Sequence, residues 1–244
     1  MSTRIIVNGA HGKMGSLACV TIQQHPDFEL VAALGRSDNL EQAITTCKPN
    51  IVIDLTRADC VYTNSEIIIK CGARPLIGTS GLVEEQIIQL RKLCFEQQLG
   101  GMIVPNFSIS AVLMMKFAAQ AAAYITDVEI VESHHQQKLD APSGTALKSA
   151  EMISAARKQN RNKLDIKEII PCARGGVHHD INIHSLRIPG VLAHQKIIFG
   201  GQGETLTITH NTIDRSCFMP GLILCCQKIQ QLNTLYYGLE HILS

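Results

Sequence analysis

Short apolar runs and stretches of helical periodicity alternate along the first part of the chain. An apolar run at residues 5–7 leads into a glycine turn, and residues 13–24 repeat apolar positions at helical spacing. The alternation continues to residue 107 and predicts strands at 4–10, 28–34, 51–56, 74–80 and 102–107 and helices at 13–24, 60–70 and 83–97. Strands separated by helices indicate a parallel sheet with right-handed crossovers and helices on both faces.

The pattern changes after residue 110. It predicts a helix at 110–125, a strand at 127–135, a helix at 145–159 and then strands at 180–188, 195–201 and 204–213. This order suggests a second domain with a mixed or antiparallel sheet. The last apolar helix, at 219–232, is expected to return to the first domain. The sequence therefore predicts an α/β fold with a parallel-sheet domain at 1–106 and 216–244 and a second, α+β domain at 107–215.

Composition favours a compact protein that binds a small molecule. The 244 residues are 45% hydrophobic and 18% charged, which is enough apolar material for one sizeable core or two unequal ones. The net charge is +1 and aromatic residues make up 4%, so the basic surface and stacking residues of a nucleic-acid-binding protein are both missing.

The lengths of the apolar runs and the pattern of cysteines also limit the possible cellular locations. The apolar run near the N-terminus is too short for a signal peptide, and no run is long enough to cross a membrane, so we expect a cytoplasmic protein. The nine cysteines are scattered without a Cys-x-x-Cys motif, and we interpret them as reduced thiols, several of them in the core.

Three glycines connect the first predicted strand to the first helix. Gly9, Gly12 and Gly15 follow a Gly-x-x-Gly-x-x-Gly spacing at the start of a βαβ unit. Backbone N–H groups and the helix dipole at such a turn can hold a pyrophosphate, and a Cβ atom there would block its approach. We therefore predict a Rossmann-like dinucleotide-binding domain, with a merely tight turn as the alternative. His11 and Lys13 either touch phosphate or are solvated loop residues.

Further loops at the carboxyl ends of the predicted strands are candidates to complete the dinucleotide site, because ligands of open α/β sheets bind at that edge. Each loop alone could be an ordinary turn, but the loops recur at the same end of successive strands. The candidates are Gly35 and Arg36, Thr56 and Arg57, residues 78–81 and residues 105–107.

A second group of polar residues follows the first predicted strand of the second domain. His134 and His135 end this strand on opposite sides, and Lys138 adds a positive charge nearby. The Ser-Gly-Thr segment at 143–145 precedes a helix and would offer a hydroxyl cap and N–H donors to a carboxylate. The set suits an acidic substrate that accepts a hydride and then a proton from a histidine. The alternative is a surface pair of Lys138 with Asp140, a capped helix and two structural histidines.

Four further histidines raise the question of a metal site. They are His178, His179, His184 and His194. Imidazole is a common zinc ligand, but the spacing matches no closed structural zinc site, and neither a cysteine pair nor a His-Glu-x-x-His motif accompanies them. We expect no bound metal.

Five motifs occupy the loops that these patterns single out. They are GAHGKMG at 9–15, VIDLTR at 52–57, IGTSG at 77–81, VPNFSIS at 104–110 and, above all, ESHHQQKLDAPSGTA at 132–146. Together they resemble the 4-hydroxy-tetrahydrodipicolinate reductase (dihydrodipicolinate reductase) family of bacterial lysine and diaminopimelate biosynthesis. The similarity spans nearly the whole chain, including GETLTITH at 203–210 and the later Arg215.

This resemblance implies an activity and an assembly. The activity is the NAD(P)H-dependent reduction of a cyclic dicarboxylate, 4-hydroxy-tetrahydrodipicolinate, to tetrahydrodipicolinate with release of water. The assembly is a homotetramer built through the sheet of the second domain, which would serve substrate binding and tetramerisation.

The resemblance also implies roles for single residues. His134 matches the proton donor or acceptor of the family, and Lys138 matches its second catalytic group. His135, Gly144 and Thr145 match its contacts to the substrate carboxylates. The cofactor-binding positions that carry over are Gly9, Ala10, His11, Gly12, Lys13, Met14, Arg36, Gly78, Thr79, Ser80, Val104, Pro105, Asn106 and Phe107.

The cofactor positions contain one departure from the family. Many relatives carry an acidic residue after the second strand, where it accepts hydrogen bonds from the ribose of NADH, and here that place is Gly35. Arg36 stands beside it, and its guanidinium can pair with a 2′-phosphate. We therefore expect NADPH to be preferred and NADH to be accepted. The alternative is that Arg36 only stacks on the adenine.

Two other functions are weighed against this one. Another Rossmann-fold oxidoreductase acting on a small dicarboxylate is the first. If it were a semialdehyde dehydrogenase, it would need an activated cysteine, and only Cys172, close before Arg174, has such a neighbour. The second is a non-catalytic dinucleotide sensor, which would keep the glycine turn and lose His134, His135 and Lys138.

Overall fold

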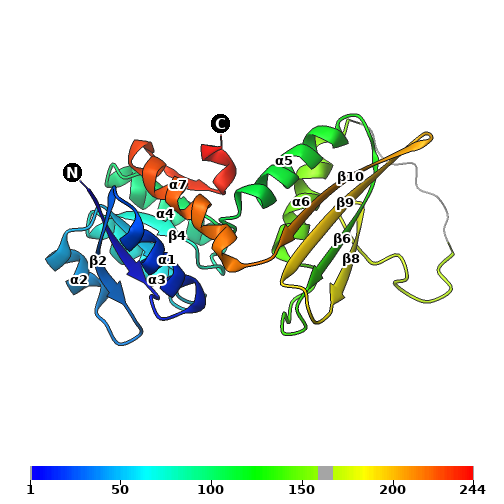
Figure 1. The fold of residues 1–244 in the computed structure, drawn as a ribbon. Helices are drawn as coiled ribbons and strands as arrows, with labels where there is room; N and C mark the ends of the chain where they lie inside the picture. Colours follow the sequence, from blue (N-terminus) through cyan, green and yellow to red (C-terminus); the bar gives the residue numbers. More distant parts are fainter. Residues whose placement is uncertain (1, 159–166, 244) are drawn as a thin grey trace. The chain divides into compact units, whose positions relative to one another are not determined.

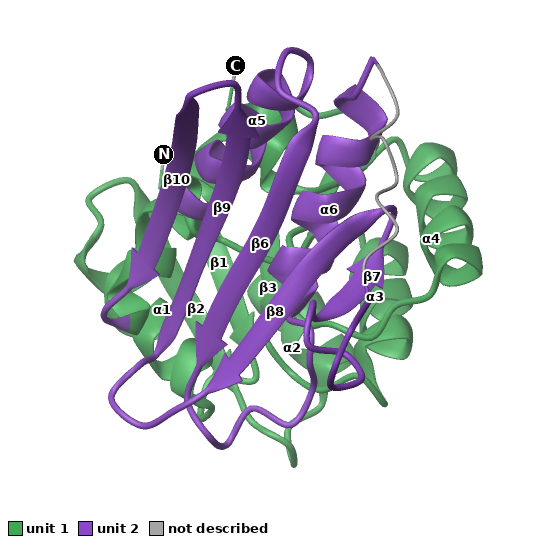
Figure 2. Cartoon of the chain, turned by 90° about the vertical axis from the view of Figure 1, so that its right-hand side faces the viewer, with its two compact units in different colours: residues 1–109, 215–244 green, residues 110–214 purple. Residues whose placement is uncertain are grey.

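The computed structural model describes residues 2–158 and 167–243. The chain forms two compact units, coloured separately in Figure 2: unit 1 holds residues 1–109 and 215–244, and unit 2 holds residues 110–214. The last α-helix therefore belongs to the same unit as the first. No helix among the described residues is both long and apolar enough to span a membrane.

Unit 1 is built on one sheet of six parallel strands in the order β11-β5-β4-β3-β1-β2 (Figure 1). Its strands are β1 (Thr3–Asn8), β2 (Phe28–Leu34), β3 (Ile51–Asp54), β4 (Arg74–Ile77), β5 (Gly101–Ile103) and β11 (Leu235–Tyr237). Its helices are α1 (Lys13–Gln24), α2 (Leu40–Cys47), α3 (Val61–Lys70), α4 (Glu84–Glu96) and α7 (Met219–Lys228), with 3₁₀ turns at Arg215–Phe218, Ile229–Gln231 and Leu239–Ile242. Parallel strands with a helix between each pair confirm the predicted Rossmann-like fold.

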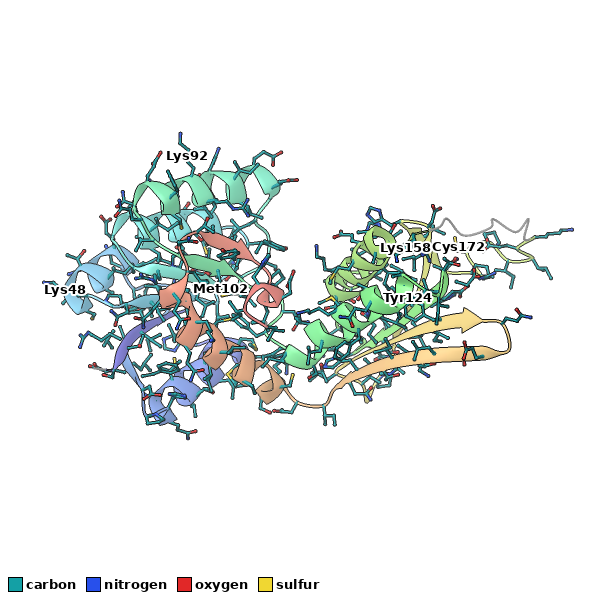
Figure 3. The ribbon with its side chains drawn as sticks, turned by 90° about the horizontal axis from the view of Figure 1, so that it is seen from above. Lys48, Lys92, Met102, Tyr124, Lys158 and Cys172 are labelled. Carbon is teal, nitrogen blue, oxygen red and sulfur yellow. The ribbon has the colours of Figure 1, made fainter. Side chains whose placement is uncertain are left out.

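Apolar residues on both faces explain why this sheet is covered on both sides. Helices α2, α3 and α4 pack on one face, against buried residues that include Ile6 and Val52, and α1 and α7 pack together on the other. Figure 3 shows Met102 in the interior of unit 1, where it is fully buried, whereas the cationic Lys48 and Lys92 lie on the outside.

The strands of unit 1 end at one level. In the parallel pairings Asn8 lies beside Leu34 and Asp54, and Asp54 lies beside Ile77. The loops after β1, β2, β3 and β4 therefore leave the sheet at the same edge, which is where ligands of such sheets bind.

Unit 2 contains a five-stranded sheet in the order β10-β9-β6-β8-β7. Its elements are α5 (Ile109–Ala122), β6 (Asp127–His134), α6 (Gly144–Ala156), β7 (Gly176–His178), β8 (Ile181–Arg187), β9 (Ala193–Gly201) and β10 (Glu204–Thr212). The pair of β6 with β8 is parallel and the other pairs are antiparallel, which confirms the predicted mixed sheet. Figures 1 and 2 show α5 and α6 on one face of this sheet, and no described helix of unit 2 lies on the other.

Three short elements were not predicted from the sequence, and some predicted strands are longer than the observed ones. Helix α2 has eight residues with Leu40 and Ile44 buried, too few to display a helical period, and β7 and β11 have three residues each. The strands predicted at 51–56 and 74–80 stop at Asp54 and Ile77. The neighbouring strands end at this level, so the backbone leaves the sheet there and turns into the loops.

Two glycines allow α1 to begin directly after β1. Gly9 has φ +86°, and a Cβ atom there would lie 2.4 Å from the carbonyl oxygen of Leu55. A Cβ atom at Gly15 would lie 2.0 Å from the carbonyl oxygen of Gly9. Gly12, the N-cap residue of α1, is different, because its Cβ atom would lie 3.4 Å from the same oxygen. Packing therefore requires glycine at positions 9 and 15 and leaves room at position 12.

We predict that Gly15→Ala destabilises unit 1 more than Gly12→Ala does. The new methyl group at position 15 forces α1 away from β1, and the free energy of unfolding should fall by about 1 to 3 kcal/mol. Urea or thermal unfolding of the two variants measures this difference. Gly12→Ala should cost less than about 1 kcal/mol, the loss of a glycine N-cap. Equal losses in the two variants would contradict the packing argument.

Candidate active site

A cavity of about 570 Å³ lies at the carboxyl edge of the sheet in unit 1. The loops after β1, β2 and β3 line it, and Gly12 places the N-terminus of α1 on its wall. Of the predicted cofactor residues, Gly9, His11, Gly12 and Arg36 are brought together around this space. Free N–H groups at a helix N-terminus favour an anion, so the cavity is suited to the phosphates of a nucleotide.

The other predicted cofactor positions do not line this cavity. They are Ala10, Lys13, Met14, Gly78, Thr79, Ser80, Val104, Pro105, Asn106 and Phe107. Residues 78–80 and 104–107 follow β4 and β5, so they lie farther along the same edge of the sheet. Val104 and Phe107 are buried, and only their backbone groups are suited to contact a ligand.

His11 occupies the space beside Gly35. A Cβ atom at position 35 would lie 2.6 Å from His11 Cδ2, so an acidic side chain is excluded there while His11 keeps its place. An acid stands three residues later: Asp38 Oδ2 accepts a hydrogen bond from the Gly35 N–H at 2.7 Å, and Asp38 lines the cavity with Arg36. Asp38 was not predicted from the sequence as a site residue, although an aspartate just after a strand is a common turn residue.

A buried carboxyl group joins the loops of this edge. Asp54 is fully buried, and its Oδ2 accepts hydrogen bonds from the side-chain amides of Asn8 at 3.0 Å and Asn64 at 2.9 Å. Its Oδ1 accepts from the hydroxyl groups of Thr56 at 2.7 Å and Thr79 at 2.6 Å. The end of β1, helix α3 and the loops after β3 and β4 are thereby held to one another. No role was predicted for Asp54 from the sequence.

Unit 2 holds a second cluster at the carboxyl end of β6. His134 is the last residue of this strand, and its Nδ1 lies 2.6 Å from Glu132 Oε2. The two residues are separated by one position, so they point to the same face of the sheet. The His134 side chain is 17% exposed and the Glu132 side chain is completely buried.

Arg187 on the neighbouring strand completes this cluster. It lies beside His134 in the parallel register of β6 and β8, and its Nη2 and Nη1 donate to Glu132 Oε1 and Oε2 at 2.9 and 3.0 Å. Burial raises the pKa of Glu132, but hydrogen bonds from His134, Arg187 and Ser185 outweigh burial and lower this pKa to about 2. Glu132 is therefore a carboxylate at neutral pH.

The predicted cap of the next helix is present. The Ser143 hydroxyl accepts a hydrogen bond from the Ala146 N–H at 3.2 Å, and the Ser143 N–H donates to Glu132 Oε1 at 3.2 Å. Gly144 begins α6, and a Cβ atom there would meet nothing within 4 Å. Space for a ligand therefore borders the first turn of α6, where Thr145 follows.

Lys138 and Asp140 form the ion pair that was considered as the alternative to a substrate site. Lys138 Nζ lies 2.8 Å from both carboxylate oxygens of Asp140. Asp140 is 67% exposed, so this pair is weak and can exchange for another carboxylate. His135 lies just beyond β6, and its Nδ1 is buried without a partner. His134 and His135 thus have separate surroundings.

The four histidines weighed as metal ligands lie in different places, and His194 is on β9, where it pairs in register with Ser133 of β6. His184 Nε2 lies 2.8 Å from Glu129 Oε2 on the open face of the sheet. His178 and His179 lie near Glu151, with potential ligand atoms within 4.8 Å of one another. The four histidines therefore do not form one ligand set.

The surroundings of Cys172 do not support a catalytic cysteine. Cys172 is exposed, and the Arg174 guanidinium that might have activated it pairs with Glu129 instead. A thiol needs a nearby positive charge to act as a nucleophile at neutral pH. The geometry therefore does not favour a semialdehyde dehydrogenase.

Comparison with known proteins covers the whole chain. A family model described as "Dihydrodipicolinate reductase, N-terminus" matches residues 3–107, and one described as "Dihydrodipicolinate reductase, C-terminus" matches residues 110–243. The 4-hydroxy-tetrahydrodipicolinate reductase of Legionella pneumophila (strain Philadelphia 1) is 66% identical over 243 residues. That of Coxiella burnetii (strain RSA 493) is 49% identical over 243 residues, and each match covers 100% of both chains.

Solved structures agree with the sequence matches. The dipicolinate-bound dihydrodipicolinate reductase from Paenisporosarcina sp. TG-14 has a TM-score of 0.91 and 41% identity, with 100% of both chains covered. An amine dehydrogenase from Mycobacterium smegmatis has a TM-score of 0.67 at 11% identity, covering 98% of this chain and 96% of that one, and shares the fold alone. With two family models across nearly its full length and relatives of this identity, the chain belongs to the dihydrodipicolinate reductase family.

Proposed function

We propose that this protein reduces 4-hydroxy-tetrahydrodipicolinate to tetrahydrodipicolinate with NAD(P)H. One observation in the structure carries the proposal: a histidine held by a buried carboxylate stands next to the capped start of a helix that borders open space. The first element suits proton transfer and the second suits a substrate carboxylate. Full-length similarity to named reductases supports the same reaction.

The chemistry divides between the cofactor and the residues of unit 2. NAD(P)H, when bound, supplies the hydride. The reaction also consumes one proton and releases one water molecule, whose oxygen comes from the hydroxyl group of the substrate. We assign the proton exchange to His134, and Lys138 is the second catalytic group, able to leave the exposed Asp140 when a substrate carboxylate arrives.

The substrate carboxylates require donors. We assign these to His135, Gly144 and Thr145, around the N-terminus of α6. The relative from Paenisporosarcina binds dipicolinate, a flat molecule with two carboxylates, which supports a dicarboxylate substrate for this chain. No acidic residue lies in the first turn of α6, so this turn adds no negative charge of its own.

For the cofactor we propose a preference for NADPH. The imidazole of His11 fills the place where an acid would bind the ribose of NADH, and Arg36 lines the same cavity with a guanidinium suited to a phosphate. Asp38 opposes this preference, because its carboxylate would repel a 2′-phosphate. The Arg36 contact should dominate, because a guanidinium can meet a phosphate directly with paired, charge-assisted hydrogen bonds.

We also propose a homotetramer in the cytoplasm. The face of the unit 2 sheet opposite α5 and α6 carries Val131 and Ile198, which are only partly buried within the chain and would be covered by a partner. The nine cysteines are all free thiols, as expected in a reducing compartment.

Replacing His134 or Lys138 by glutamine should lower kcat by roughly 100-fold or more. Each substitution removes a group that transfers a proton or stabilises charge in the transition state. The assay couples synthase-generated substrate to the loss of NADPH absorbance. His184→Gln is the matched control, since His184 also pairs with a carboxylate of β6 but on the other face. Near-normal kcat in both His134→Gln and Lys138→Gln would remove the catalytic assignment, and a wild type without turnover would favour the sensor or another dicarboxylate oxidoreductase.

Pyridine-2,6-dicarboxylate should inhibit competitively with substrate, because its two carboxylates need the same donors at the start of α6. Thr145→Val should weaken this inhibition about tenfold through the lost hydroxyl group, whereas Thr145→Ser should retain it. Inhibition constants of the three proteins measure the effect. Non-competitive inhibition, or inhibition that ignores Thr145, would place the dicarboxylate elsewhere.

The ratio of kcat/KM for NADPH over NADH should favour NADPH, and Arg36→Ala should reduce this ratio roughly tenfold to a hundredfold through the lost phosphate contact. Asp38→Asn is the complementary variant and should raise the ratio, because it removes a negative charge from the same cavity. A ratio near one that neither substitution changes would show that this loop does not distinguish the two cofactors.

A further inference from the structure

The buried carboxylate of Glu132 contacts three parts of unit 2: the end of β6, strand β8 and the N-cap of α6. Its Oε2 lies 2.6 Å from His134 Nδ1 and accepts a hydrogen bond from Arg187 Nη1 at 3.0 Å. Its Oε1 accepts hydrogen bonds from Arg187 Nη2 at 2.9 Å and from the Ser143 N–H at 3.2 Å. Glu132 holds the proposed catalytic histidine, but it has so far been given no part of its own in the reaction. A charged group that is completely buried is costly and is kept only where its partners are well placed.

We propose that Glu132 is the positioning residue of the active site, selecting which nitrogen of His134 exchanges the proton and holding that histidine in a fixed relation to the start of α6. This inference rests on the proposed function and deepens it.

The choice of nitrogen follows from hydrogen-bond chemistry. An ionised carboxylate can only accept, so the nitrogen that faces it at 2.6 Å must carry a hydrogen. Nδ1 of His134 is therefore a donor to Glu132 in the neutral and in the protonated ring alike. Nε2 is left as the nitrogen that gains and loses the proton. Glu132 thereby prevents the other neutral tautomer, in which Nε2 would already be occupied by a hydrogen.

The ionised state of Glu132 is secured by its partners. The bidentate contact with Arg187 compensates its charge, and with the other donors it keeps the pKa of Glu132 far below neutrality in spite of burial, which by itself raises this pKa. The carboxylate is therefore an acceptor over the whole range in which the enzyme would work.

The same group also holds the carboxylate-binding turn. Ser143, the N-cap residue of α6, donates its N–H to Glu132, and Arg187 Nη2 donates to the carbonyl oxygen of Asp140 at 2.6 Å. Two points of the segment between β6 and α6, Asp140 and Ser143, are thus tied to the Glu132–Arg187 pair. A shift of Glu132 would move His134 and the donors of Gly144 together.

Glu132→Gln tests this proposal with little change in shape. The amide offers one acceptor and one donor, so it cannot accept from His134 and from both nitrogens of Arg187 as the carboxylate does. We expect kcat to fall by roughly 10-fold or more, because losing the partner that orients a histidine costs about 10- to 100-fold at metal-bound histidines and more at histidines that transfer a proton. NADPH affinity, measured by fluorescence titration, should be unchanged, because the predicted cofactor residues lie in unit 1.

A spectroscopic measurement separates positioning from a purely structural role. Long-range ¹H–¹⁵N spectra of ¹⁵N-histidine-labelled protein, with His134→Gln for assignment, report which ring nitrogen carries the hydrogen. The wild type should show hydrogen on Nδ1 of neutral His134, and Glu132→Gln should lose this preference.

Glu129→Gln is the matched control. Glu129 stands on the same strand and holds a histidine and an arginine, His184 and Arg174, on the opposite face. It should change neither kcat nor the His134 signals. Normal kcat in Glu132→Gln, or His134 signals identical to those of the wild type, would overturn the proposal. Because the spectra need no turnover, they test Glu132 even if the wild type fails to reduce the proposed substrate, and that failure would count against the proposed function alone.

Discussion

The carboxyl group of Asp54 is completely buried at the end of β3, where it would be strongly destabilising without donors. Four side chains supply them: Asn8, Thr56, Asn64 and Thr79. These donors come from β1, from α3 and from the loops after β3 and β4, so satisfying one acid organises most of the ligand-binding edge of unit 1. The wall of the cavity is therefore set by the folded chain before a cofactor arrives, which reduces the entropy lost on binding.

Unit 2 uses the same constraint with a different result. Glu132 is also buried at the end of a strand, but its donors include a full positive charge from Arg187 and a titratable ring from His134. Asp54 joins loops that surround a space, whereas Glu132 joins a histidine to the start of a helix. The first arrangement suits binding, and the second suits proton transfer to a bound anion.

Under the proposed function, the two units divide the requirements of a reductase between them. Unit 1 provides the glycine turn, Arg36 and the cavity, and unit 2 provides His134, Lys138 and the capped helix. Each arrangement is held by contacts inside its own unit. A substitution in one cluster is thus expected to leave the internal geometry of the other intact, which makes the roles of the two units separable by experiment.

Local patterns in the sequence determined the elements and the local parts of the site. Helix α1 and strand β2 have the bounds that periodicity predicts, the glycines of the turn follow from a strand meeting a helix, and Ser143 caps α6 as its position suggests. Such features depend on residues within a few positions of one another. The tertiary structure alone decided where strands end, which acids matter and what pairs with them. Arg187 reaches Glu132 across 55 residues because β8 lies beside β6, and His11 meets Gly35 because β1 lies beside β2. Sheet order and register are set by the burial of whole faces, and no local stretch of the chain contains that information.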